Sequence, residues 1–296
     1  MTGWGADEVS VRFGSRQALD RVTVSAVPSQ VTVVVGADGA GKTTLLRCVA
    51  GELAPVAGTV RRPPARRIGY LPSGTGVYVD LSVAENLRFR SAIYGIPASA
   101  ARRHIGEYLE RTGLDAAADR LAGQLSGGML RKLGVVAAML PEPELLVLDE
   151  PTTGVDPVSR ADLWWLIARA VADGAAVLMS TTYTDEASRA GRVLVLDSGR
   201  TLADGTPAEI VAAVPGTIAV LPGPPAAGDE RRRAWRRAGA WRVWLPPAAP
   251  TVGEVVTPDL QDAVCVAALR RELAAFGAFG ADGASGADGA FGAGDG

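Results

Sequence analysis

The fold is decided by the stretch Val31-Thr-Val-Val-Val-Gly36-Ala-Asp-Gly-Ala-Gly-Lys42-Thr43-Thr44. Its β-branched run predicts a buried strand over 31–35, and residues 42–49 predict a helix that ends near Gly51. A glycine-rich turn between a strand and a helix can point its backbone N–H groups at phosphate oxygens, and the helix adds its positive end. The stretch matches the pattern G-x-x-x-x-G-K-[ST], which predicts a site for nucleotide phosphates and a magnesium ion.

The pattern gives each residue of this loop a task. Lys42 is expected to reach the β- and γ-phosphates, and Thr43 is expected to offer its hydroxyl to Mg²⁺. Lysine occurs only at Lys42 and Lys132 although the chain has 30 Lys plus Arg, so position 42 favours the compact ammonium. The predicted nucleotide-binding residues of the loop are Gly36, Ala37, Asp38, Gly39, Ala40, Gly41, Lys42, Thr43 and Thr44.

A second apolar strand, Leu145-Leu-Val-Leu-Asp149-Glu150, ends in two carboxylates. Successive side chains at a strand end point in different directions, so the two acids can serve different tasks. Asp149 is expected to hold Mg²⁺ directly or through water. Glu150 is expected to polarise an attacking water as general base. The alternative, a solvated loop start after a core strand, is disfavoured by the phosphate loop upstream.

The remaining pattern describes an α/β chain with a helical insertion. Strands separated by helices imply a mainly parallel, covered sheet, and residues 80–140 are mostly helical. Ser82 and Glu85 form the pattern of a capping box. The expected strands are 9–13, 22–25, 176–179, 193–196 and 241–245, and the expected helices are 99–111, 127–140 and 259–273. Residues 216–275 are interpreted as a small accessory α+β element, and the Gly/Ala-rich residues 276–296 as a disordered tail.

Composition restricts the location and the partners. A net charge of -2 argues against a nucleic-acid partner. Cys48 and Cys265 are far apart and suggest no disulfide framework. No stretch approaches the roughly 20 apolar residues that cross a bilayer, and the start of the sequence lacks the pattern of a signal peptide. A membrane process would therefore be served from the cytosolic side.

The motif Leu125-Ser126-Gly127-Gly128-Met129 precedes the acidic strand. Ser126 can cap a helix whose N-terminus the two glycines leave open to an anion. In this order and spacing, residues 8–215 resemble the ATPases of ABC type. The resemblance implies a P-loop NTPase core with a mixed, mainly parallel sheet, an α-helical signature subdomain at about 80–140, and a small C-terminal accessory element.

In that family two nucleotide-binding domains pair head to tail, and each ATP lies between the phosphate loop of one chain and the signature of the other. The resemblance therefore implies that Ser126, Gly127 and Gly128 contact the ATP held by a partner domain. Gly154-Val155-Asp156 resembles the D-loop, which crosses the dimer interface. Phe13 falls where the family places an aromatic residue that stacks on adenine, and its alternative is a core role on an edge strand.

The sequence departs from the family at two positions. Ile68-Gly-Tyr-Leu-Pro72 resembles the strand before the Q-loop, where Ser73 replaces the usual glutamine. Ser180-Thr-Thr182-Tyr183 resembles the switch segment, where Thr182 replaces the usual histidine. The resemblance implies a catalytic role for both residues and an Mg²⁺ contact for Ser73. The hydroxyls of Ser73 and Thr182 can still donate hydrogen bonds, directly or through water. ATP binding is expected to persist, with hydrolysis slow or dependent on a partner. The single histidine, His104, is expected to be solvated.

The signature, the stretch Asp149-Glu150-Pro-Thr-Thr-Gly-Val-Asp156-Pro and the ending Thr257-Pro-Asp-Leu-Gln-Asp262-Ala-Val resemble ATPases of the drug-exporter type. The resemblance implies an ATP- and Mg²⁺-dependent subunit that powers a drug exporter from the cytoplasmic side of the cell membrane. It also implies a separate transmembrane permease and a second nucleotide-binding domain, either a copy or a sister subunit. The permease is expected to dock on residues 73–95, with Tyr78, Leu81 and Tyr94 as candidates. The alternatives are a regulatory half-site with little hydrolysis, or a non-transport ABC ATPase acting on ribosomes or DNA.

Overall fold

A six-stranded sheet forms the centre of the first part of the chain in the computed structural model, which describes residues 3–225 and 228–283. The strand order is β5-β6-β7-β3-β8-β9. These strands are β3 (Gln30–Val35), β5 (Ile68–Leu71), β6 (Leu145–Asp149), β7 (Ala176–Thr181), β8 (Arg192–Asp197) and β9 (Arg200–Gly205). All neighbours pair in parallel except β9, which is antiparallel to β8. The predicted mixed, mainly parallel sheet is confirmed.

The register of the sheet gathers the predicted motifs at one edge. β6 and β7 are buried at every residue, as expected for parallel strands covered on both faces. Val35 at the end of β3 pairs with Thr181, and Asp149 at the end of β6 pairs with Ser180. The phosphate loop, the acidic pair and the switch segment therefore all leave the sheet at its carboxyl edge, where α/β folds bind ligands.

A second sheet lies beside the phosphate loop. Its strands β1 (Trp4–Phe13), β2 (Arg16–Ala26) and β4 (Ala57–Arg61) pair antiparallel in the order β2-β1-β4. β1 and β2 are longer than the predicted strands 9–13 and 22–25. Helix α1 (Lys42–Ala50) joins both sheets in one apolar core, and it ends at Gly51 as predicted.

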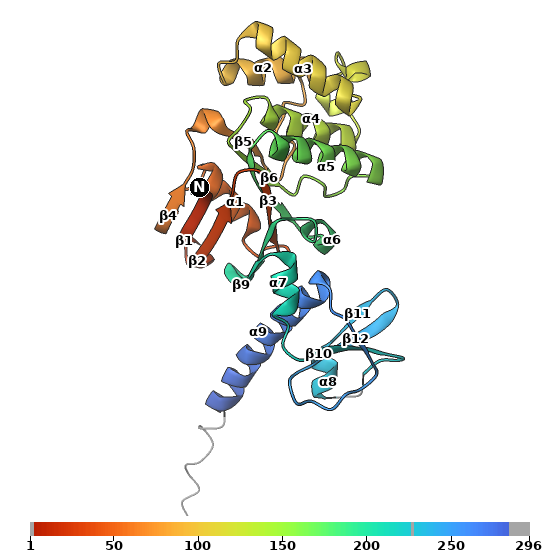
Figure 1. Cartoon of the computed structure of the whole chain (residues 1–296). Helices are drawn as coiled ribbons and strands as arrows, with labels where there is room; N and C mark the ends of the chain where they lie inside the picture. The colour runs from red at the N-terminus through yellow and green to blue at the C-terminus, as the bar shows by residue number, and fades with distance from the viewer. Residues whose placement is uncertain (1–2, 226–227, 284–296) are drawn as a thin grey trace, which may run out of the picture. The chain divides into compact units, whose positions relative to one another are not determined.

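The helical insertion is present, and Figure 1 shows α2 and α3 beyond α4 in the first unit. Ser82 and Glu85 make both hydrogen bonds of the predicted capping box. Gly128 and the run Lys132–Met139 make α4 largely buried, which explains its apolar composition. The helices of this region and beyond are α2 (Val83–Ile93), α3 (Ala98–Thr112), α4 (Gly127–Met139), α5 (Pro157–Ala172), α6 (Thr184–Ala187) and α7 (Pro207–Ala212), with 3-10 turns at Ala65–Arg67, Asp115–Ala117 and Ala122–Gln124.

The chain divides into two compact units, Met1–Pro207 and Ala208–Gly296. The second unit has an antiparallel sheet in the order β11-β12-β10-β13, with a small core around Ile218, Trp244 and Val266. Its elements are β10 (Thr217–Leu221), α8 (Asp229–Arg232), β11 (Ala234–Arg237), β12 (Ala240–Leu245), β13 (Glu254–Val256) and α9 (Leu260–Gly283). The predicted strand and helix are found here.

Helix α9 continues ten residues past its predicted end, from 273 to Gly283. It thus covers the first part of the segment interpreted as a disordered tail, because alanine favours the helix strongly enough to offset the interspersed glycines. The rest of that predicted tail, 284–296, lies outside the described residues. Within the described residues, no helix is long and apolar enough to cross a membrane.

Candidate nucleotide site

A cavity of about 440 Å³ lies between the β1–β2 hairpin and the phosphate loop, a size that suits a small ligand. It brings together three groups that are distant in the sequence: Phe13, the loop residues 38–44, and Glu150. Its lining residues are Phe13, Arg16, Gln17, Ala18, Asp38, Gly39, Ala40, Gly41, Lys42, Thr43, Thr44, Glu150 and Ser198. Phe13 is 49% exposed, so it belongs to the cavity and not to the core of an edge strand.

The loop has the conformation that its glycines allow. Gly41 has φ 107°, and a Cβ there would lie 2.8 Å from Leu19 Cδ2 and 2.9 Å from the Ala18 carbonyl oxygen. A Cβ at Gly36 would lie 2.3 Å from the Leu196 carbonyl oxygen. Gly41 is the N-cap of α1 and has no side chain, so the N–H groups of the first turn stay available to an anion.

Lys42 is buried beneath this loop and is held by two kinds of acceptor. Its Nζ donates to the carbonyl oxygens of Gly36 at 2.8 Å and Ala37 at 3.2 Å. The same Nζ lies 3.1 Å from Glu150 Oε1. The ammonium group predicted to meet phosphate is therefore paired with the carboxylate predicted to be the general base.

The backbone of Glu150 is strained in a way that fixes its carboxylate. Its φ is 49°, in the left-handed region where a non-glycine residue is uncommon and where functional sites are over-represented. Its N–H donates to Ser180 Oγ at 2.9 Å, and its Oε2 accepts from Thr153 Oγ1 at 3.2 Å. Both ends of the residue are thus held while Oε1 reaches Lys42.

Asp149 is fully buried beside Glu150 and offers a free oxygen. Its Oδ1 accepts a 2.5 Å hydrogen bond from Ser180 Oγ, whereas its Oδ2 has no partner among the described residues. Thr43 is exposed at the cavity. Oxygen donors from few side chains suit Mg²⁺, which keeps waters and substrate phosphates as its other ligands. The described residues contain no cluster of three His, Cys, Asp or Glu side chains suited to a metal.

The two substituted positions lie outside this cavity. Ser73 and Thr182 are both exposed and line neither wall. Beside Thr182, the buried Glu186 accepts hydrogen bonds from Thr152 Oγ1 at 2.8 Å and Thr181 Oγ1 at 2.7 Å. Glu186 belongs to the stretch Asp185-Glu186-Ala187 that completes the resemblance to the switch segment, but the sequence assigned it no role. In the structure it joins the segment after β6 to the switch segment.

The signature motif begins α4 as expected. Ser126 is the N-cap, and its Oγ accepts from the Met129 N–H at 3.3 Å. Gly127 is exposed, with open space around the position of a Cβ. Gly128 is buried, and a Cβ there would lie 2.5 Å from Ser159 Oγ and 2.8 Å from Ser159 Cβ on α5. The two glycines therefore serve different purposes: the first leaves space open, and the second allows two helices to approach.

The segment 73–95 presents exposed apolar side chains. Tyr78 is 56% exposed, and its ring meets Phe89 edge-on at 5.1 Å. Val79, Phe89 and Ile93 are also exposed. Of the other two candidates, Leu81 is half-buried. Tyr94 is also half-buried, its hydroxyl donates to the Ile68 carbonyl oxygen at 3.1 Å, and burial raises its pKa.

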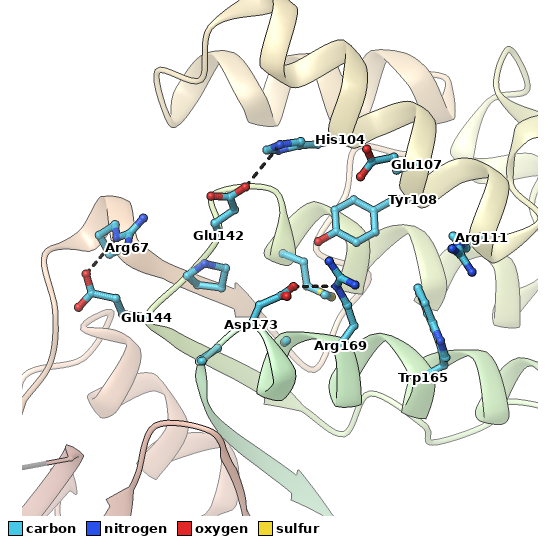
Figure 2. A pocket seen from close by; sticks show the side chains of 15 residues that line it. Arg67, His104, Glu107, Tyr108, Arg111, Glu142, Glu144, Trp165, Arg169 and Asp173 are labelled. Carbon is cyan, nitrogen blue, oxygen red and sulfur yellow. Dashed lines mark hydrogen bonds and ion pairs between the residues drawn. The ribbon is translucent and has the colours of Figure 1, made fainter. Parts of the chain in front are cut away.

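A second cavity of about 630 Å³ lies between α3, α5 and the segment after α4 (Figure 2). Its charged side chains pair among themselves, as in Arg67–Glu144 at 3.0 Å and Arg169–Asp173 at 2.9 Å. His104 Nε2 lies 3.4 Å from Glu142 Oε1, and the imidazole is only 15% exposed. The expectation of a solvated His104 was wrong, because the histidine points from α3 toward Glu142 in the segment that follows α4.

Comparisons with known proteins indicate the family of the chain. The ABC transporter family model matches residues 19–153. The Escherichia coli (strain K12) "Probable multidrug ABC transporter ATP-binding protein YbhF" is 38% identical over 204 residues, covering 66% of this chain and 35% of that protein. The chain thus spans about a third of that relative. The "Nod factor export ATP-binding protein I" of Paraburkholderia xenovorans (strain LB400) is 34% identical, covering 70% of this chain and 71% of that protein.

A further relative and two solved structures extend the match. The "Daunorubicin resistance ATP-binding protein DrrA3" of Streptomyces coeruleorubidus is 38% identical and covers 70% of this chain and 69% of that protein. A structure titled "Structure of ATP binding subunit of ABC transporter" has TM-score 0.66 and 26% identity, covering 71% of this chain and 92% of its own. A dimeric bacterial ABC transporter cassette shares the fold, with TM-score 0.63 and 19% identity over 69% of this chain and 98% of its own. The chain belongs to the ABC transporter family, as an ATP-binding domain.

Proposed function

We propose that this domain hydrolyses ATP with Mg²⁺ and powers an exporter. The observation that carries the proposal is the buried Lys42 ammonium, held between the phosphate-loop carbonyls and Glu150 in a cavity of nucleotide size. Phosphate oxygens would replace Glu150 as the partner of Lys42. The N–H groups at the start of α1 would bind the same phosphates, and the Phe13 ring would stack on adenine.

ATP hydrolysis would follow once phosphate replaces Glu150 as the partner of Lys42. Thr43, Asp149 and Ser73 would hold Mg²⁺, which neutralises charge on the phosphates when it is bound. Glu150, once separated from Lys42, would accept the proton of the attacking water at Oε1. Thr153 and Ser180 keep its carboxylate and backbone in place. Ser73 and Thr182 would offer shorter hydrogen-bond donors than the glutamine and histidine usual in the family, which favours slow turnover.

Two partners are part of the proposal. Ser126, Gly127 and Gly128 lie outside this cavity, and they would contact the ATP of a second nucleotide-binding domain, a copy or a sister subunit. The exposed apolar side chains of residues 73–95 would dock a separate transmembrane permease at the cytoplasmic side of the membrane. Residues 8–215 would then be the motor, and 216–275 an accessory element.

The test is Mg-ATP turnover by the full chain and by Glu150→Gln, with Glu144→Gln as the matched control. Glu144 is a half-exposed acid on the same segment, paired with Arg67 at 3.0 Å and outside the nucleotide cavity. Loss of a general base is expected to lower turnover by about 10²–10⁴-fold, whereas the control stays unchanged. Equal turnover in all three chains would refute the role of Glu150.

ATP binding without hydrolysis by the unsubstituted chain would favour the second candidate, a regulatory half-site. One observation supports that candidate: Ser73 and Thr182 are exposed and lie outside the cavity. Addition of a sister ATPase domain would then be expected to restore turnover at the composite site.

A further inference from the structure

The backbone of residues 73–76, which follow β5, is held by arginine side chains of the helical subdomain. Arg131 on α4 donates from Nη1 to the Gly74 carbonyl oxygen at 2.6 Å and from Nη2 to the Ser73 carbonyl oxygen at 3.1 Å. Arg90 on α2 donates from Nη2 to the Gly76 carbonyl oxygen at 2.7 Å. Hydrogen bonds from a charged donor are the stronger kind, so this segment is fastened to the helices.

The segment also lies directly on α4. A Cβ at Gly134 would lie 2.7 Å from the Thr75 carbonyl oxygen and 2.8 Å from Leu71 Cδ1. The glycine therefore allows the backbone of 73–76 to approach the same helix face that carries Arg131. A residue with a Cβ at position 134 would push the backbone of 73–76 away from α4.

Arg131 is a partly buried cation. Burial lowers the pKa of its guanidinium, while the charges of Asp149 and Glu150 act in the opposite direction. The hydrogen bonds of this cation go to the backbone of Ser73 and Gly74. The side chain of Ser73 makes none of these bonds, because only its carbonyl oxygen is engaged.

We infer that Arg131 is the positioning residue for Ser73, because it holds the backbone of the segment 73–76 against α4. The inference rests on the proposed function, in which Ser73 acts at the nucleotide. With its carbonyl oxygen held by Arg131, the backbone of Ser73 has a defined place on α4 from which the exposed hydroxyl would act. The planar fork of arginine serves two adjacent carbonyls at once, which a lysine ammonium does less well.

Two measurements on the full chain test the inference, each with Arg131→Ala, Arg131→Lys and the control Arg102→Ala. Arg102 is an exposed residue of α3, which lies in the same helical subdomain. The first measurement is Mg-ATP turnover, separated into kcat and KM. Arg131→Ala is expected to lower kcat about tenfold, the equivalent of one charge-assisted hydrogen bond, with KM unchanged because Lys42 is untouched. Arg131→Lys is expected to regain part of kcat.

The second measurement is hydrogen exchange of the peptide 72–78 with and without Mg-ATP. The unsubstituted chain and Arg102→Ala are expected to exchange more slowly in this peptide when Mg-ATP is bound, and Arg131→Ala is expected to lose that difference. A purely structural tie would speed exchange equally in both conditions. Arg131→Lys serves as the decisive variant if the alanine variant does not fold.

Three outcomes would overturn the inference. In the first, Arg131→Ala keeps the ATP-dependent protection of the peptide 72–78. In the second, Arg131→Ala changes kcat and KM no more than Arg102→Ala does, and in the third, the unsubstituted chain binds Mg-ATP without protection of the peptide. Absence of turnover in the unsubstituted chain would instead count against the proposed hydrolysis. In that case the exchange measurement still decides the role of Arg131.

Discussion

Alanine substitutions at Gly127 and Gly128 distinguish the two roles of the signature glycines. Gly128→Ala tests the packing of α4 on α5, and Gly127→Ala tests the proposed contact with nucleotide. At Gly128 the added Cβ would lie 2.5 Å from Ser159 Oγ and 2.8 Å from Ser159 Cβ. The hydroxyl can rotate away, but Ser159 Cβ is fixed to the backbone of α5, so the two helices must move apart. A Cβ added at Gly127 would instead meet open space. Gly127→Ala is therefore the matched control, one residue away on the same helix.

The magnitude follows from these contacts. Inserting a methyl group into a packed contact costs about 1–3 kcal/mol, so we expect Gly128→Ala to lower the free energy of unfolding by about 2 kcal/mol. For a domain of this size that corresponds to a fall in Tm of roughly 4–8 °C. Gly127→Ala is expected to change stability little, or to raise it by up to about 1 kcal/mol through helix propensity.

Urea and thermal unfolding of the two variants, in the absence of nucleotide, provide the assay. Equal stability of the two variants would contradict the prediction, because it would mean that α4 and α5 do not approach at Gly128 as closely as the contacts indicate. ATP-dependent dimerisation, measured separately, addresses the proposed contact with the partner's nucleotide. Gly127→Ala should weaken dimerisation without loss of stability.

Three further predictions concern other parts of the chain. Thr182→His is expected to raise Mg-ATP turnover at least tenfold if position 182 faces the γ-phosphate, because a single transition-state donor can contribute about 10²–10³-fold; unchanged turnover would place position 182 away from the reaction. The Ser159 N–H and side chain lower the pKa of Asp156, so its stabilising effect is present above the ordinary pKa of an aspartate and is lost as pH falls through the lowered value. Thermal unfolding of Asp156→Asn between about pH 3 and 6 should therefore show a weaker acid dependence than the unsubstituted chain, and parallel curves would contradict this. Asp262→Asn should destabilise the second unit by about 3 kcal/mol, since Asp262 is fully buried against Arg237 and Arg242; hydrogen exchange of the β12 amides measures it, and unchanged protection would show that the ion pairs are dispensable.

Local patterns predicted the elements that carry the chemistry. The β-branched run before Gly36 and the apolar run before Asp149 each form a buried strand, because both patterns lie within one continuous segment. Their meeting at one sheet edge followed from the parallel arrangement. The roles proposed for Lys42 and Glu150 remain predictions, although the structure brings the two residues to 3.1 Å.

The supporting contacts could not be predicted, because they depend on register between distant segments. Ser180 bonds Asp149 because β6 and β7 are paired at those two residues. Arg131 bonds Ser73 across 58 positions of sequence. A serine after a strand and an arginine on a helix carry no local signal of either contact. The continuation of α9 to Gly283 was missed for a local reason. Its alanines favour a helix, but the Gly/Ala-rich composition was interpreted as disorder.

The pairing of Lys42 with Glu150 has a consequence for the order of events in the proposed mechanism. The cation that recognises phosphate also neutralises the charge of the proton acceptor, so Glu150 is a weak base as long as the ion pair persists. Only a ligand that draws the ammonium away unmasks the carboxylate. Nucleotide binding and activation of the general base are then coupled through one side chain, Lys42.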